Sequence, residues 1–111
     1  MKVTTTQNGD VTVLEVAGEF TWDAVARFTE AADRAFAGGH RDFVVDLRNV
    51  EIIDSAGLET LTALQRRCEE QLGMVRFCGP DADLRKIFEL TRLDRSLMVH
   101  EQMEEALGSF A

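Results

Sequence analysis

The chain of 111 residues has no tyrosine and a single proline, Pro80, and it contains only eight glycines. It therefore has no proline-rich or glycine-rich stretch that would indicate a linker, and it also lacks repeats and low-complexity segments. A chain of this length lies within the usual size range of one domain and can bury one layered core. We expect residues 1–111 to form a single domain.

Cysteine is scarce, and two cysteines do not make a disulfide framework. Cys68 falls on an apolar helix face and Cys78 ends a strand-like run, where a free cysteine behaves as a small buried hydrophobe. Reduced thiols fit the cytoplasm. The first ten residues lack the apolar core of a signal peptide, and no window approaches a membrane span. A cytoplasmic location is expected.

Basic residues are also few, because 12 Lys and Arg stand against 20 Asp and Glu, for a formal net charge of −8. Nucleic-acid phosphates and anionic lipids repel such a chain, so we expect no nucleic-acid partner and no direct membrane insertion. A basic protein surface would complement the charge. The alternative is that the charge only keeps a small domain soluble.

The residue constellations of enzymes are missing. The sequence contains no glycine-rich phosphate loop, no catalytic Ser-His-Asp set and no metal-ligand cluster. His40 and His100 stand alone near turns, so a solvated surface position is expected for both rather than metal ligation. Arg66-Arg67, followed by Glu69-Glu70, indicates a solvated helix face. These absences predict a protein that is not an enzyme and needs no cofactor.

Strand and helix patterns alternate along the chain in the order β-β-α-β-α-β-α-β-α. This order predicts an α/β fold, a small mixed sheet of four to five strands with about four α-helices packed on it. The expected strands are Lys2–Thr6, Val11–Ala17, Phe43–Leu47, Met74–Cys78 and Leu97–Val99. The expected helices are Trp22–Ala37, Ala56–Gln71, a short helix after Asp81, and a C-terminal helix carrying Met103, Leu107 and Phe110. The expected core comprises Val13, Val16, Phe28, Val44, Val45, Leu61, Leu64, Phe77, Ile87 and Leu107.

The first helix has recognisable start signals. Thr21 stands where an N-cap is expected, and Phe20 and Val25 would then form a hydrophobic staple. Trp22, the only tryptophan, has two open interpretations. It is either an exposed interface anchor or a ring that covers the edge of the core.

The segment from Asp46 to Leu58 carries most of the functional information. A buried strand ends, a loop follows, and Ser55 is delivered to a helix start, whose N–H groups and dipole tolerate a phosphate. Asp54 places a carboxylate beside this serine, and either residue can be the N-cap. A Ser55 cap would lack its capping-box partner, because Leu58 stands where Glu or Gln is needed. Gly57, without a side chain, is expected to let another protein's backbone approach closely.

The run Asp54-Ser55-Ala56-Gly57-Leu58 resembles the Asp-Ser-Ser/Thr-Gly-Leu motif of the STAS domain, the family named for sulfate transporters and anti-sigma factor antagonists. Gly18-Glu19-Phe20 resembles the family's Gly-Glu-hydrophobic end of the second strand. Asp46-Leu47 resembles its acidic residue at the end of the central strand, and the run from Ile87 to Asp94 resembles its third helix. The resemblance covers nearly the whole chain.

The resemblance implies a stand-alone anti-sigma factor antagonist (anti-anti-sigma factor), a phosphoprotein that regulates transcription by bacterial partner switching. Its unphosphorylated form would bind an anti-sigma factor serine kinase and release the sigma factor, and phosphorylation at Ser55 would abolish this binding. The implied partners are an anti-sigma factor serine/threonine kinase and a phosphatase acting on phospho-Ser55. The implied partner-binding residues are Phe20, Thr21, Trp22, Asp54, Ser55, Ala56, Gly57, Leu58 and Glu59.

Two positions depart from the family pattern. Ala56 stands where many antagonists carry a second hydroxyl, which leaves Ser55 as the only hydroxyl at this helix start. Thr21 stands where many members have Asp. The alternative function that the resemblance implies is an accessory subunit of a membrane transport complex that docks onto its ATPase. Such proteins often lack an acceptor serine, so Ser55 favours the antagonist.

Overall fold

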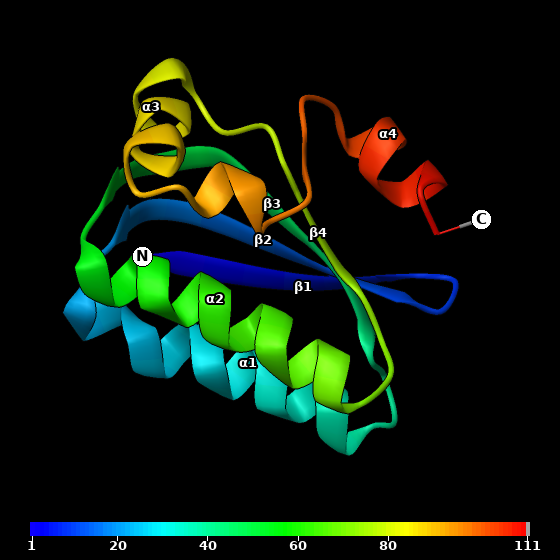
Figure 1. Ribbon diagram of the computed structural model, residues 1–111. Coiled ribbons are helices and arrows are strands. Elements are labelled where there is room, and N and C mark those ends of the chain that lie inside the picture. The colour runs from blue at the N-terminus through cyan, green and yellow to red at the C-terminus, as the bar shows by residue number, and fades with distance from the viewer. Residues whose placement is uncertain (111) are drawn as a thin grey trace.

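The computed structural model describes residues 1–110 and contains a five-stranded sheet in the order β1-β2-β3-β4-β5 (Figure 1). β1 runs antiparallel to β2, and the other neighbouring strands are parallel. The predicted mixed sheet is therefore confirmed. The strands are β1 (Lys2–Asn8), β2 (Val11–Phe20), β3 (Asp42–Ile53), β4 (Val75–Cys78) and β5 (Val99–His100).

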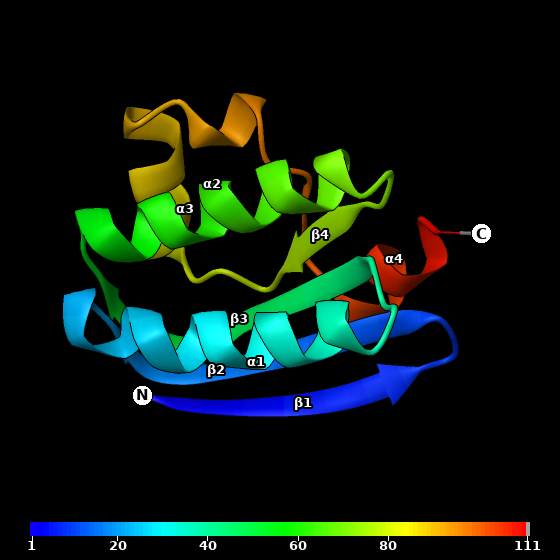
Figure 2. The same ribbon diagram turned by 90° about the horizontal axis from the view of Figure 1, so that it is seen from below.

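Within residues 1–110, four α-helices and two short 3-10 helices accompany the sheet, which confirms the predicted α/β class. They are η1 (Trp22–Ala24), α1 (Val25–Ala37), α2 (Ser55–Glu70), α3 (Ala82–Leu90), η2 (Leu93–Arg95) and α4 (Met103–Gly108). Helices α1 and α2 lie side by side on one face of the sheet (Figure 2). No helix within residues 1–110 has the length and hydropathy that crossing a membrane requires.

The period-two pattern of the strands builds two cores on the two faces of the sheet. The larger core joins the sheet to α1, α2 and α3 and includes the fully buried rings of Phe20, Phe28, Phe43, Phe77 and Phe88. The smaller core joins it to α4 through Val11, Val13, Val44, Cys78 and Ala106. Ile87 and Leu107 were expected in the core but are only half-buried, because the short helices α3 and α4 cover the sheet incompletely.

Strand β3 is longer than expected. Residues 48–53, predicted as part of a loop, continue the strand as far as Ile53 because they pair in parallel with the second half of β2. Asp46 consequently lies inside the strand rather than at its end. Its buried carboxylate accepts from the Arg48 guanidinium at 2.8 Å, and this hydrogen bond raises the pKa of Arg48.

The first helix also begins differently from the prediction. Residues 22–24 form the 3-10 turn η1, and α1 starts at Val25. Thr21 occupies the N-cap position of η1, but its side chain caps no backbone N–H. Its hydroxyl instead donates to the Asp23 carboxylate, which lowers the pKa of Asp23.

The predicted burial of the cysteines is confirmed, whereas the predicted exposure of the histidines and of Arg67 is wrong. Cys68 and Cys78 are buried as expected, and burial raises the pKa of each thiol to about 12. His40 is half-buried rather than solvated, and so is His100, which β5 pairs with Cys78 of β4. The His100 Nε2 is buried without a hydrogen-bond partner among residues 1–110. Arg67 is half-buried over the Phe36 ring, so only part of the Arg66-Arg67 pair is solvated.

Candidate functional site

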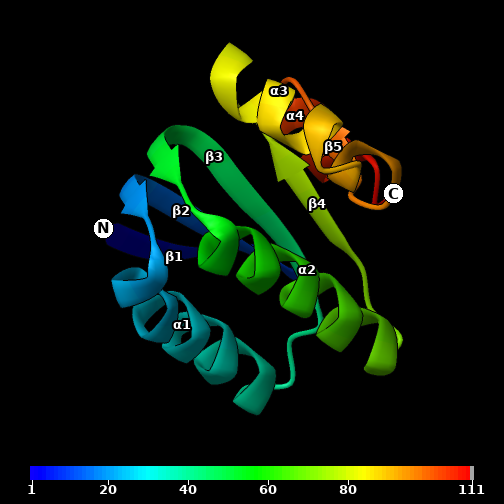
Figure 3. The same ribbon diagram turned by 60° about the vertical axis from the view of Figure 1, so that its left-hand side comes forward.

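The candidate site lies where β2 and β3 end together and α2 begins (Figure 3). Phe20, the last residue of β2, pairs with Ile53, the last residue of β3. The Asp54 N–H then donates to the Phe20 carbonyl at 3.4 Å. Parallel pairing thus brings the turn after β2 against the first turn of α2, although more than 30 residues separate them in the sequence.

Asp54 joins these two segments through its carboxylate. One oxygen, Oδ1, accepts from the Gly57 N–H at 2.9 Å and caps α2. The other, Oδ2, accepts from the Trp22 N–H at 2.9 Å. Of the two possible N-caps, Asp54 is therefore the cap, and an acidic side chain suits the position because both oxygens accept from backbone donors.

Ser55 is the first residue of α2, and its side chain is exposed. The first N–H groups of a helix have no acceptor within it, and Asp54 satisfies that of Gly57. The hydroxyl of Ser55 thus lies at the surface beside the positive end of the helix dipole, where added negative charge is tolerated.

Gly57 has an internal role, which corrects the expectation that a partner's backbone approaches it. The residue is buried, and a Cβ atom there would lie 2.3 Å from the Phe20 carbonyl oxygen and 2.7 Å from Cγ1 of Ile53. Glycine is required because α2 starts directly against β2 of the same chain. The Phe20 side chain is also fully buried, so that, contrary to expectation, it cannot contact a partner.

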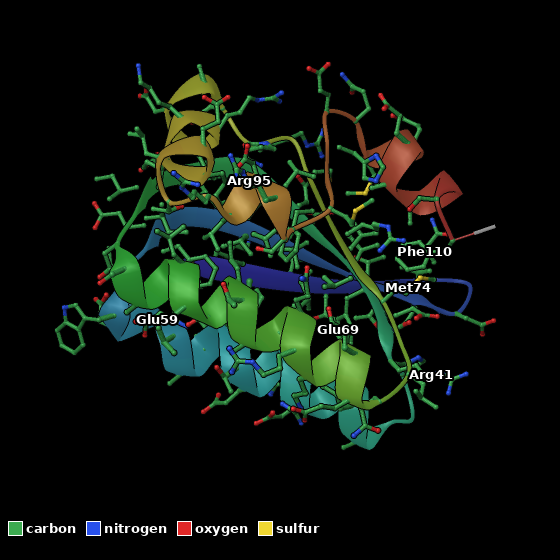
Figure 4. The ribbon with its side chains drawn as sticks, viewed as in Figure 1. Arg41, Glu59, Glu69, Met74, Arg95 and Phe110 are labelled. Atoms are coloured by element: carbon green, nitrogen blue, oxygen red, sulfur yellow. The ribbon has the colours of Figure 1, made fainter. Side chains whose placement is uncertain are left out.

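Other expected contact residues remain accessible. Trp22 is 76% exposed, so its ring does not cover the core, and of its two interpretations only the exposed one stands. Glu59 is exposed one turn after Ser55, at the end of the molecule opposite Met74 and Phe110 (Figure 4). The half-buried residues of the expected set are Thr21, Asp54, Ala56 and Leu58.

Two grooves lie beside the first turns of α2. One, of about 340 Å³, separates it from α1 and is lined in part by Ala56 and Glu59. The other, of about 520 Å³, separates it from the α3–η2 region. Three further α2 residues, Thr62, Ala63 and Arg66, line it beside Ser55, Leu58 and Glu59. Thr91 and Leu93 complete the lining, and no local motif could indicate these two because they come from a distant segment.

The site combines an exposed hydroxyl with a carboxylate that backbone donors hold in place. Both oxygens of the Asp54 carboxylate already accept from backbone N–H groups. In the part of the chain that the structure describes, residues 1–110, no three His, Cys, Asp or Glu side chains are grouped as a metal ion would need. The Ser55 hydroxyl is an accessible nucleophile at the start of α2.

Several solved structures have the same fold. An anti-sigma factor antagonist from Mycobacterium paratuberculosis aligns with a TM-score of 0.87 at 23% identity, covering 97% of this chain and 92% of that one. The phosphorylated Bacillus cell fate determinant SpoIIAA aligns with a TM-score of 0.77 at 20% identity, covering 99% and 100%. A sulfate transporter family protein from Wolinella succinogenes aligns at 0.79 and 21%, covering 90% and 84%. These likenesses establish the fold.

Sequence comparison identifies the family. Curated protein sequences yield no significant match. A family model described as "Mlab, STAS domain" matches residues 3–101, which is most of the chain. The Asp54–Leu58 run and the strand end at Gly18–Phe20, which carried the resemblance, both lie inside the matched range. The chain therefore belongs to the STAS domain family.

Proposed function

We propose that this chain is an anti-sigma factor antagonist in a bacterial partner-switching pathway. Unphosphorylated, it binds an anti-sigma factor serine kinase, and the sigma factor is released. Phosphorylation of Ser55 abolishes that binding, and a phosphatase acting on phospho-Ser55 restores it. The chain acts in the cytoplasm as a binding partner of other proteins and catalyses no reaction itself.

The observation that carries the proposal is the position of Ser55. It is an exposed hydroxyl on the first residue of α2, and its neighbours are locked by the two hydrogen bonds of Asp54. Among the similar structures, SpoIIAA is described both as an anti-sigma factor antagonist and in a phosphorylated form. Both descriptions agree with an acceptor serine on this fold.

A phosphate at Ser55 changes the surface more than it changes the fold. It adds about −1.5 to −2 charges beside Asp54, whose carboxylate cannot turn away without releasing the Trp22 or Gly57 N–H. The helix start offsets part of the repulsion in the unbound domain. A partner closing over the site must desolvate the phosphate, which costs several kcal/mol unless cations meet it. Each loss of about 1.4 kcal/mol weakens binding tenfold.

The test is incubation with ATP and the serine kinase encoded beside this gene, followed by mass spectrometry. We expect one phosphate on Ser55, none on Ser55→Ala, and unchanged modification of Ser96→Ala, which removes another exposed serine hydroxyl. Modification at Ser96, or of Ser55→Ala, would contradict the proposal.

A second candidate function is an accessory subunit of a membrane transport complex that docks onto its ATPase. The similarity to a sulfate transporter family protein favours it. The exposed Ser55 favours the antagonist over this alternative. Binding to a neighbour-encoded transporter ATPase, with no phosphorylation by a serine kinase, would reverse the order of the two candidates.

A further inference from the structure

The Ser55 end of the molecule carries an excess of acidic residues. Three segments meet there, residues 19–26, 49–65 and 79–84, through the pairing of β2 with β3 and a groove shared by β3 and α3. They contain seven of the 20 acidic residues and none of the 12 basic ones. Four arginines directly flank these segments, Arg27, Arg48, Arg66 and Arg85, and Arg66 lines the Ser55 groove. With them counted, this end of the molecule carries seven acidic and four basic residues, so it remains net acidic.

Six of these seven carboxylates are exposed, among them one in η1, one in β3 and one in α2. Asp23 follows Trp22 in η1, Glu51 lies near the end of β3, and Glu59 lies one turn into α2. The Thr21 hydroxyl, assisted by the N-terminal ammonium and Arg27, lowers the pKa of Asp23 and keeps it ionised. Asp54 is occupied with backbone N–H groups, as is Asp81, which caps α3.

Two exposed apolar side chains lie within this acidic region. Trp22 is 76% exposed and Ile52 is 54% exposed. The Trp22 backbone is bonded to Asp54 on the side of α1, whereas Ile52 lines the groove toward α3 with Asp83 and Ile87. Large apolar side chains inside a charged border match the usual anatomy of a protein interface, with a desolvated centre and a polar rim.

We infer that the partner of the Ser55 surface is a protein that presents an apolar cleft for Trp22 and Ile52, bordered by Lys and Arg side chains. This inference rests on the proposed function and specifies the chemistry of its binding surface. The acidic rim attracts the partner over a distance and sets the association rate, whereas the apolar centre sets the dissociation rate. A phosphate on Ser55 falls at the apolar centre of the interface, where it must be desolvated. It therefore shortens the lifetime of the complex even with a basic partner.

The first experiment measures the affinity of the neighbour-encoded kinase with ADP for variants of the apolar centre. Trp22→Ala is expected to weaken binding at least 30-fold through faster dissociation, and Ile52→Ala at least fivefold. Leu72→Ala and Met98→Ala are matched controls, because these side chains are similarly exposed, 86% and 52%, outside the three acidic segments. They should stay within twofold of the wild type. A Trp22→Ala affinity within twofold of the wild type would overturn the inference.

The second experiment measures the association rate in 50 mM and 500 mM NaCl. The triple variant Asp23→Asn, Glu51→Gln, Glu59→Gln is expected to associate about tenfold more slowly at low salt and to lose most of its salt dependence. A control triple variant removes the same charge from exposed residues elsewhere, by Glu69→Gln, Glu70→Gln and Glu105→Gln. Equal effects of the two triple variants would show that net charge matters and that the acidic rim does not.

The outcomes separate the inference from the proposed function. If the kinase phosphorylates Ser55 and binds but neither set of variants matters, the function stands and the inference fails. If the transporter ATPase binds with the predicted dependence on Trp22 and salt while the kinase does not, the inference stands and the proposed function fails. Absence of binding to both proteins overturns both.

Discussion

Helix α2 packs closely against a neighbouring backbone at both of its ends, and a glycine permits the approach in each case. Near its start, a Cβ at Gly57 would lie 2.3 Å from the Phe20 carbonyl oxygen. Just beyond its end, a Cβ at Gly73 would lie 2.0 Å from the Arg41 carbonyl oxygen. Each glycine lets the helix approach a neighbouring backbone that any side chain would push away. The Ser55 end is therefore not more loosely packed than the other.

The two ends differ in what they expose. At the C-terminal end, Arg67 pairs with Asp33 and stacks on the Phe36 ring, and acidic and basic side chains are mixed. At the N-terminal end the exposed charged side chains nearest Ser55, those of Glu51 and Glu59, are acidic, and the Trp22 indole ring remains uncovered. The difference indicates that the candidate site differs from the other end of α2 in its charge and exposed side chains, and not in how tightly the helix is packed.

The largest effect on stability is expected from variants that disturb the close packing at the ends of α2. Gly57→Ala should lower the free energy of unfolding by about 3 kcal/mol, because the new methyl group meets a backbone oxygen that cannot move independently. Gly73→Ala should cost a similar amount. Urea unfolding measures both, as a lower midpoint at an unchanged m-value.

Gly108→Ala is the control for these variants, because no atom outside its own helix turn lies within 4 Å of its Cβ position. Its stability should change by no more than about 1 kcal/mol. A Gly57→Ala protein as stable as the wild type would show that the turn after β2 can yield, and the comparison of two equally rigid ends would fail.

A smaller effect is expected from removing the cap. Asp54→Ala deletes acceptors for two backbone N–H groups and should cost about 2 kcal/mol of stability. Asp81→Ala deletes the single acceptor of the Leu84 N–H at the start of α3 and should cost about 1 kcal/mol. If thermal or urea unfolding gave equal losses, the bond to Trp22 would contribute nothing.

The next effect concerns binding. Ser55→Asp should bind the partner kinase at least tenfold more weakly than Ser55→Ala in the presence of ADP, a difference of about 1.4 kcal/mol. The alanine variant keeps an uncharged surface, whereas the aspartate adds a charge beside Asp54. Surface plasmon resonance can measure both affinities, and equal values would contradict exclusion by charge.

The smallest effect is expected on the fold itself. Phosphorylation of Ser55 should cost less than about 1 kcal/mol of stability, because the helix start accommodates part of the charge. Backbone amide NMR of the two forms should show shifts confined to the residues around Asp54–Leu58 and the adjoining turn at Trp22. Shifts reaching α4, on the opposite face of the sheet, would mean that phosphorylation switches the conformation of the domain.

Much of this architecture could be predicted from local patterns. Apolar periodicity places a strand across Phe43–Leu47 and helices near α1 and α2, and the motif Asp54–Leu58 indicates the family that the family model confirms. The boundaries were less predictable. Residues 48–53 contain polar side chains and were predicted as a loop, but parallel pairing with β2 satisfies their backbone and holds them in a strand.

The sequence by itself therefore determined the order of the elements, the fold class and the hydroxyl at the start of α2, because these depend on neighbours a few residues apart. Only the tertiary structure decided that Asp54 binds the Trp22 N–H, that Gly57 packs under the Phe20 carbonyl, and that Trp22 is uncovered. It also gathered the acidic segments at one end. These features depend on contacts between residues about 30 positions or more apart, which no local pattern encodes.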